Sequence, residues 1–193
     1  MDKELNIAWM YPDILFLHGD RGNIMAFKHV GEKLGIKVNI HRIDTYCMDI
    51  PMEEMDIIFL SPGELNGTSS VIKDLEKYKE ILEDKVVIAI GTSGVVLAKE
   101  TIKQDGTAIK GLGLLDMQCM ERKEILGDDL YFKIEDLEIM GSQIQMVDTK
   151  LGNVDALGTV VYGHGNKGET KEGAKYKDIV FTNCLGPVFV KNP

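Results

Sequence analysis

The stretch VVIAIGTSGVVLAKE, residues 86–100, decides the fold. Five consecutive apolar residues run into a Gly-Thr-Ser-Gly turn at 91–94, and an apolar pattern with helical spacing resumes after it. An uninterrupted apolar run is typical of a strand covered on both faces, so the segment predicts a buried strand, a tight turn and a helix. Many α/β enzymes keep a nucleophile at such a turn. The first functional question is therefore which atom, if any, does chemistry there.

Strands and helices alternate along the first half of the chain. In chain order, the apolar patterns predict a strand at 5–10, a helix at 24–34, strands at 38–43 and 56–60, a helix at 71–82 and a strand at 86–90. Gly35 lies where a helix end favours a left-handed residue, and a side-chain oxygen of Asp20 or Asn23 is placed to cap the first helix. This alternation predicts an α/β fold with a mainly parallel sheet flanked by helices.

The second half of the chain has a different pattern. After Lys103, glycine-rich turns, among them 105–107 and 127–129, separate short strand-like pieces. These pieces are 130–134, 137–140, 143–147 and 156–162. They predict antiparallel strands that extend or flank the sheet. Because no repeat or interdomain linker interrupts the pattern, we expect residues 1–193 to form a single domain.

Composition narrows the classes of function. The 193 residues carry a net charge of -9 with acidic and basic residues mixed, which argues against nucleic acid as a partner but not against a small anion. The three cysteines are far apart, and this pattern favours neither a disulfide framework nor a zinc site. No signal peptide or run of about 20 apolar residues is present, so we expect no membrane segment and a cytoplasmic location.

Other patterns have ordinary interpretations. Gly163-x-Gly165-x-x-Gly168 matches a dinucleotide fingerprint, but the residues after it cannot form the required helix, and we interpret it as a hairpin loop. The four histidines lack metal-binding spacing, so we expect no metal and no cofactor. The paired carboxylates at 53–54 and 128–129 are expected to be solvated turn charges.

The turns at 61–64 and 91–94 follow neighbouring predicted strands and should meet at the carboxyl edge of the sheet. Backbone amides at the start of a helix favour a carboxylate, a phosphate or a developing oxyanion. Thr92 and Ser93 are candidate nucleophiles only if a base lies within reach. On the motif alone, they are better interpreted as caps of the helix that begins near Gly94.

A set of short motifs spans almost the entire chain. They are Gly19-Asp20-x-Gly22-Asn23, DIIFLSPG at 56–63, Asp105-Gly106-Thr107, GLGLLD at 111–116, Gly127-Asp128, LGTV at 157–160, Gly163-x-Gly165-Asn166, Lys171-Glu172-Gly173, Gly186-Pro187 and Lys191-Asn192. In this order they resemble the class I glutamine amidotransferases of the cobyric-acid-synthase-like group. The resemblance is closest to the glutaminase subunits of lipid II isoglutaminyl synthases, which partner a Mur-ligase-like protein. It implies a flavodoxin-like class I glutamine amidotransferase fold.

The resemblance also identifies positions at which this chain departs from the family. The family turn reads I-C-G-G-Y-Q-x-L-G, and an ungapped alignment places Gly91 at its nucleophilic cysteine. The family base lies in T-Y-L-H-G-P, and Leu185 stands at that histidine. Ser61-Pro62-Gly63-Glu64 replaces the glycine-rich oxyanion turn, and Gln143 lies in the stretch that corresponds to G-F-E-N-H. The candidate ligand-pocket residues are Ser61, Pro62, Gly63, Glu64, Gly91, Thr92, Ser93, Gly94 and Gln143, with no catalytic residue among them.

Three functions follow as hypotheses. The first is a pseudo-glutaminase, a non-hydrolysing subunit that binds or scaffolds a Mur-ligase-like, amide-forming enzyme. The second is a functional amidotransferase that supplies ammonia for amidation of lipid II or of a cobyrinate-type substrate. The third is a binding module for a small carboxylate, in a pocket that glycine at position 91 would enlarge.

Overall fold

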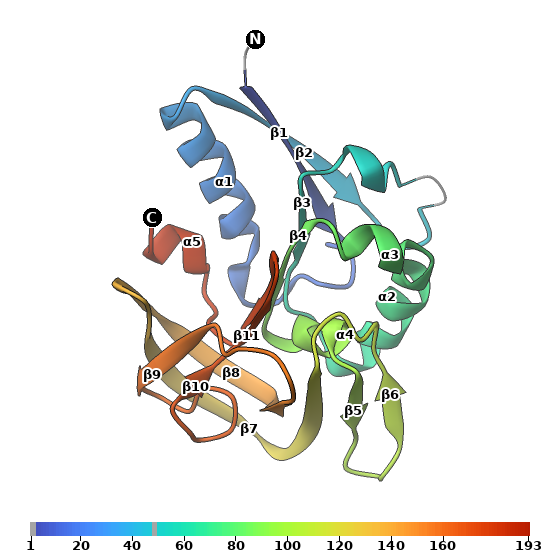
Figure 1. Cartoon of the computed structure of the whole chain (residues 1–193), viewed down its shortest axis with the longest axis vertical. Helices are drawn as coiled ribbons and strands as arrows, with labels where there is room; N and C mark the ends of the chain where they lie inside the picture. Colours follow the sequence, from blue (N-terminus) through green and yellow to red (C-terminus); the bar gives the residue numbers. More distant parts are fainter. Residues whose placement is uncertain (1–2, 48–49) are drawn as a thin grey trace.

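A computed structural model describes residues 3–47 and 50–193, and it contains two adjacent six-stranded sheets (Figure 1). Across the first sheet the strands are β11 (Ala174–Tyr176), β12 (Ile179–Thr182), β4 (Val86–Ile90), β3 (Ile57–Leu60), β1 (Lys3–Met10) and β2 (Ile36–Ile43). All neighbours pair in parallel except β11, which runs antiparallel to β12 at the edge. The predicted mainly parallel sheet is confirmed.

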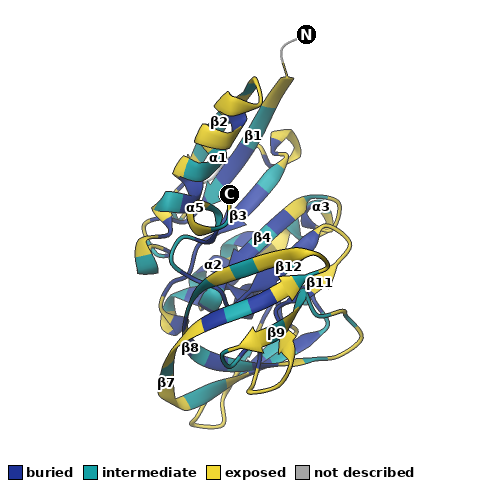
Figure 2. Cartoon of the chain, turned by 90° about the vertical axis from the view of Figure 1, so that its left-hand side faces the viewer, coloured by how far each residue is buried: buried dark blue, intermediate teal, exposed yellow. Residues whose placement is uncertain are grey.

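Helices cover both faces of this sheet (Figure 1). One face carries α1 (Arg21–Lys33) and α5 (Val188–Lys191), and the other carries α2 (Thr68–Leu75), α3 (Lys79–Leu82) and α4 (Gly94–Leu97). Successive strand residues alternate between the two faces: Phe59 packs in the apolar cluster that contains Ile24 of α1, whereas Leu60 packs with Val71 of α2. The central strands β3 and β4 are mostly buried, whereas the edge strands β2 and β11 are mostly intermediate or exposed (Figure 2). The continuously apolar strands therefore lie in a sheet that helices cover on both faces.

Two predicted helices differ in length from the structure. The helix expected at 71–82 is divided into α2, a short 3-10 helix and α3. The helix after the turn is only α4, because the carbonyl groups that would extend it accept hydrogen bonds from the chain at 112–115. Val96 and Leu97 accept from Leu112 and Leu115 at 2.8 and 2.9 Å. Among the described residues, the 3-10 helices are Leu17–Gly19, Met52–Glu54, Leu65–Gly67, Glu76–Tyr78 and Gly91–Ser93.

The second half of the chain builds the other sheet around one long hairpin. Its strands are β5 (Glu100–Ile102), β6 (Ala108–Lys110), β7 (Met117–Ile134), β8 (Leu137–Leu151), β9 (Gly158–Tyr162) and β10 (Lys171–Glu172). The pairs are antiparallel except β5 with β7. The antiparallel extension is confirmed, but the turn expected at 127–129 is wrong. Those residues lie inside β7, paired with 142–144 of β8, and their exposed positions tolerate glycine and aspartate.

The ends of α1 confirm one expectation and correct another. Gly35 has φ +67, as predicted for a residue that ends a helix. Asp20 stands at the position before the helix, but its side chain accepts from the Asn23 side-chain amide at 2.7 Å instead of capping a backbone N–H. Within the described ranges, no helix is long and apolar enough to cross a membrane.

Close packing of α4 on β12 gives a stability prediction. A Cβ atom at Gly94 would lie 2.4 Å from Cε2 of the buried Phe181 ring, so Gly94→Ala forces the core apart. We expect a loss of about 1–3 kcal/mol in the free energy of unfolding, measured by urea denaturation. Gly127→Ala is the control, because a Cβ there meets no atom within 4 Å, and it should change stability by less than about 0.5 kcal/mol. Equal losses in both variants would contradict the packing argument.

Candidate active-site turn

The turns after β3 and β4 meet, because these parallel strands are neighbours. Three hydrogen bonds join them. The Gly63 N–H donates to Thr92 Oγ1 at 3.1 Å, Thr92 Oγ1 donates to the Gly63 carbonyl, and Ser93 Oγ donates to the Ser61 carbonyl at 2.5 Å. The expectation that Thr92 and Ser93 cap α4 is therefore wrong: both buried hydroxyls bond across to the other turn. Each hydroxyl donates to a backbone carbonyl, and neither hydrogen bond involves a side chain that could act as a general base.

Gly91 and Leu185 lie side by side at the end of β4. Gly91 has φ +58, a left-handed conformation that is open to glycine and that would strain a residue with a side chain, as at the sharp turn of a nucleophile elbow. An ideal Cβ at Gly91 would lie 3.0 Å from Leu185 Cδ2 and 3.1 Å from Pro62 Cβ. The expected enlargement of the pocket at Gly91 is therefore wrong, because these two side chains fill the space. This filling removes the main argument for a small-carboxylate site at that point.

Leu185 and its neighbour Cys184 point to different sides of the chain. Leu185 is buried with Ile24 and Phe59 beneath α1, whereas Cys184 is buried with Phe132 in the second sheet. The backbone at Leu185 forms a bridge to Ser142 of β8, with hydrogen bonds of 2.7 and 3.3 Å in the two directions. This bridge holds the Leu185 side chain toward the turn after β4.

The remaining predicted pocket residues are divided between two places. Ser61, Pro62, Gly63 and Gly94 are buried in or beside the joined turns, and Glu64 is exposed. Gln143 does not bond to these turns: its buried amide donates to the Gly165 carbonyl at 2.7 Å and accepts from the Gly165 N–H at 3.2 Å.

Ser142, instead of Gln143, lies next to the segment that carries Leu185. Its Oγ lies 3.0 Å from where a Cβ on Gly186 would stand. Alternation of side chains along β8 is the signal that distinguishes the two positions. The sequence did not predict the position of Ser142, because it did not show which face of β8 turns toward Leu185.

Asp20, like Ser142, lies near the joined turns although the sequence did not predict it there. It is 1% exposed, and Oδ2 has no hydrogen-bond partner among the described residues. Burial raises the pKa of this carboxyl to about 7, although the Ser61 hydroxyl and the Asn23 amide act in the opposite direction. The chain from which Asp20 projects is joined to the first turn by the Leu17 N–H, which donates to the Pro62 carbonyl at 3.0 Å.

A buried polar network holds the strand that leads to Leu185. Glu172 is fully buried and accepts from Thr182 Oγ1 and the Asn183 N–H at 2.7 Å, and from the Asn183 side-chain amide at 3.0 Å. Asn166 accepts from the same amide at 3.0 Å. Burial raises the pKa of Glu172 despite these donors. The network fixes the end of β12 and thereby the position of the residues that follow it.

The Gly163-x-Gly165-x-x-Gly168 stretch lies between the antiparallel strands β9 and β10, so its interpretation as a hairpin loop is confirmed. His164 Nε2 contacts Asp148 at 3.1 Å, and Arg122 forms an ion pair with the same carboxylate at 2.6 Å. Among the residues that the structure describes, no group of three histidine, cysteine or acidic side chains is placed to hold a metal ion.

The fold defines a class. Two solved structures match nearly the whole chain: a glutamine amidotransferase, with TM-score 0.61 and 16% identity, and PurLQS from Thermotoga maritima, with TM-score 0.59 and 13% identity. Each covers 96% of this chain, which in turn covers 92% and 87% of theirs. The chain has the glutamine amidotransferase fold.

Two relatives define the family more closely. GatD, a subunit of the glutamine-hydrolysing lipid II isoglutaminyl synthase, is 31% identical over 197 residues in Staphylococcus aureus and 30% identical over 199 residues in Streptococcus pneumoniae. Both alignments cover 98% of this chain, and 80% and 76% of the relatives. This chain belongs to the GatD family. No protein-family model matches it.

Burial of Asp20 predicts a pH dependence of stability. Its pKa rises from 3.8 unfolded to about 7 folded, so the folded chain binds more protons between these values and stability falls as pH rises through that window. Asp20→Asn keeps the acceptor for Asn23 and removes the buried charge. We expect it to raise the free energy of unfolding at pH 8 by at most about 4 kcal/mol, with the gain vanishing near pH 4.

Urea unfolding of both proteins from pH 4 to pH 8 measures this difference. Asp136→Asn, at an exposed residue of the β7–β8 hairpin, is the control for the loss of one negative charge. A gain that is the same at every pH, or that also appears in the control, would show that ionisation of Asp20 is not its cause.

Proposed function

We propose that the chain is a catalytically degenerate GatD-like subunit, which binds a Mur-ligase-like, amide-forming partner without hydrolysing glutamine itself. One observation carries the proposal: Gly91 and Leu185 touch at the two positions that the family resemblance gives to the nucleophile and its base. Glycine offers no side chain and leucine accepts no proton. Amide hydrolysis by the family route needs both a thiolate and a base, so this pair does not support it.

Neighbouring groups do not replace the missing pair. The Thr92 and Ser93 hydroxyls are engaged with backbone carbonyls of the other turn. Cys184 lies on the side opposite Leu185, and burial raises the pKa of its thiol to about 12, which keeps it protonated at neutral pH. Losing either member of a catalytic pair costs about as much as losing the whole unit, roughly 10⁶-fold in kcat in a protease.

The partner is inferred from the relatives. Their names describe a subunit of a lipid II isoglutaminyl synthase, an enzyme that needs a further chain. We extend this to a Mur-ligase-like partner that acts on the peptidoglycan precursor lipid II, and we expect both to work in the cytoplasm. In this arrangement the chain contributes a docking surface to the complex, and the joined turns after β3 and β4 stabilise its fold.

A functional amidotransferase subunit is the second candidate, and membership of a glutamine-hydrolysing family favours it. It would supply ammonia for amidation of lipid II or of a cobyrinate-type substrate. This function needs a nucleophile from the partner, and Leu185 and Pro62 would have to move away from Gly91 to admit it.

Glutamate release separates the two candidates. The purified chain is incubated with glutamine, alone and with the ligase-like protein from the same source, and a glutamine-hydrolysing GatD serves as positive control. We expect no release above the background of the partner alone, together with a stable complex on size-exclusion chromatography. Release that requires this chain would overturn the proposal, and failure to form a complex would remove its scaffolding part.

Restoring the pair tests the geometry of the turn. In a Cys47→Ser background, which removes the exposed cysteine, Gly91→Cys with Leu185→His should place a thiol beside an imidazole. We expect the introduced thiol to react with iodoacetamide with a pH midpoint well below the value of about 8.5 for a free cysteine. Gly91→Cys with Leu185 intact is the matched control and should show no such lowering. Identical midpoints in the two variants would mean that position 185 does not face position 91.

A further inference from the structure

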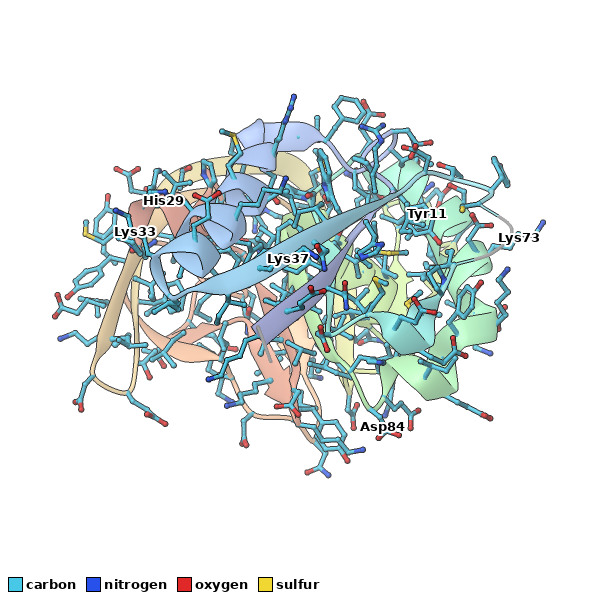
Figure 3. The ribbon with its side chains drawn as sticks, turned by 90° about the horizontal axis from the view of Figure 1, so that it is seen from above. Tyr11, His29, Lys33, Lys37, Lys73 and Asp84 are labelled. Atoms are coloured by element: carbon cyan, nitrogen blue, oxygen red, sulfur yellow. The ribbon has the colours of Figure 1, made fainter. Side chains whose placement is uncertain are left out.

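A pocket lies between α5 and the β7–β8 hairpin. The helix α5 itself lies between α1, where Figure 3 labels His29 and Lys33, and this hairpin (Figures 1 and 3). The pocket has a volume of about 420 Å³, which is within the usual range of small-molecule sites. No residue of the joined turns at 61–64 and 91–94 lines it. Its lining includes Asp129, Tyr131, Met140, Gly141, Tyr162 and Lys191.

Strand register places two tyrosines and a methionine of the pocket in one row. Tyr131 of β7 pairs with Met140 of β8 on one side and with Tyr162 of β9 on the other. Side chains of directly paired residues point to the same face of a sheet, so these three form an apolar strip across three strands. Met140 and Tyr162 are each 60% exposed, which leaves the strip open to a ligand. Aromatic rings and a thioether favour contact with large apolar or aromatic groups.

Two charges of opposite sign also line the pocket. Asp129 precedes Tyr131 by two residues on β7, so both side chains point to the same face of the sheet. Lys191 comes from α5. Neither Asp129 nor Lys191 forms an ion pair with another residue that the structure describes. A ligand can therefore bind an ammonium group to the carboxylate and a carboxylate to the ammonium.

The positions of these two charges set the length of the ligand. Asp129 of β7 lies opposite Ser142 of β8, on a strand about 4.8 Å away. Ser142 Oγ and Lys191 Nζ lie 3.0 and 3.4 Å from the point where a Cβ on Gly186 would stand, so the ammonium lies on the Ser142 side of the pocket. A free amino acid carries both charges on one carbon, whereas the two ends of an extended dipeptide are about 7 Å apart. The spacing therefore fits a dipeptide.

We propose that this pocket binds a zwitterionic dipeptide with large apolar or aromatic side chains. The ammonium end of the dipeptide pairs with Asp129, its carboxylate end pairs with Lys191, and its side chains lie on the strip of Tyr131, Met140 and Tyr162. The proposal goes beyond the proposed function, since the pocket shares no lining residue with the joined turns and binding there does not depend on glutamine hydrolysis.

Isothermal titration calorimetry on the full chain tests the proposal. The probe is the dipeptide leucyl-phenylalanine, and the matched ligands are the same dipeptide with its amino end acetylated or with its carboxyl end amidated. We expect saturable binding of the unmodified dipeptide, weakened about fivefold by each modification, the upper end for the loss of one exposed ion pair. Absence of saturable binding by the unmodified dipeptide, or equal affinity for all three ligands, would overturn the proposal.

Substitutions match each end of the ligand to its residue. Asp129→Asn should weaken binding of the unmodified dipeptide about fivefold and leave the acetylated one unchanged, and Lys191→Gln should do the same for the unmodified and amidated ligands. Asp136→Asn and Lys123→Gln, at exposed residues outside the lining, are the matched controls and should change affinity less than about twofold. Circular dichroism checks folding. Equal losses in pocket and control variants, or a loss in Asp129→Asn that persists with the acetylated ligand, would contradict the assignment.

Discussion

The hydrogen bonds between the turns after β3 and β4 are the constraint on which the site depends. Thr92 bonds both backbone groups of Gly63, and Ser93 bonds the Ser61 carbonyl, so two loops from neighbouring strands behave as one unit. This unit holds Pro62 over Gly91 and leaves Gly91 in a left-handed conformation. Glycine adopts this conformation without strain, and the hydrogen bonds of the buried hydroxyls fix the two turns to each other. The turn thus keeps its shape with glycine at its centre.

Leu185 belongs to the apolar core beside the turn after β4. It packs with Ile7, Phe59 and Ile90 beneath α1, next to the position where a nucleophile would stand. Burying a leucine side chain is worth about 2 kcal/mol, whereas a buried imidazole without a thiolate partner would cost free energy. Once position 91 lacks a side chain, an apolar residue at 185 is therefore the more stable choice. Positions 91 and 185 are therefore physically coupled through one contact.

The fold could be predicted from the sequence because short, local patterns of residues specify its strands and helix ends. Apolar runs such as 86–90 are long enough to specify strands buried on both faces, and Gly35 marks a helix end. The turn expected at 127–129 failed because glycine and aspartate are also acceptable at exposed positions of a long hairpin. At the site, positions 91 and 185, which the family resemblance gives to the nucleophile and the base, lie next to each other. That Leu185 and Pro62 fill the space, or that Asp20 is buried, depends on long-range side-chain packing that no local pattern encodes.

Contacts between the two ends of the chain link the turn beside Leu185 to α1 and α5. Leu185 is followed by Gly186 and Pro187, and Pro187 contacts Gly22 at the start of α1. Asn23 accepts from the Phe189 N–H and donates to the buried Asp20 carboxyl. Any shift of the segment that carries Leu185 would therefore also move α5. The buried Leu185 side chain helps to hold this segment in place.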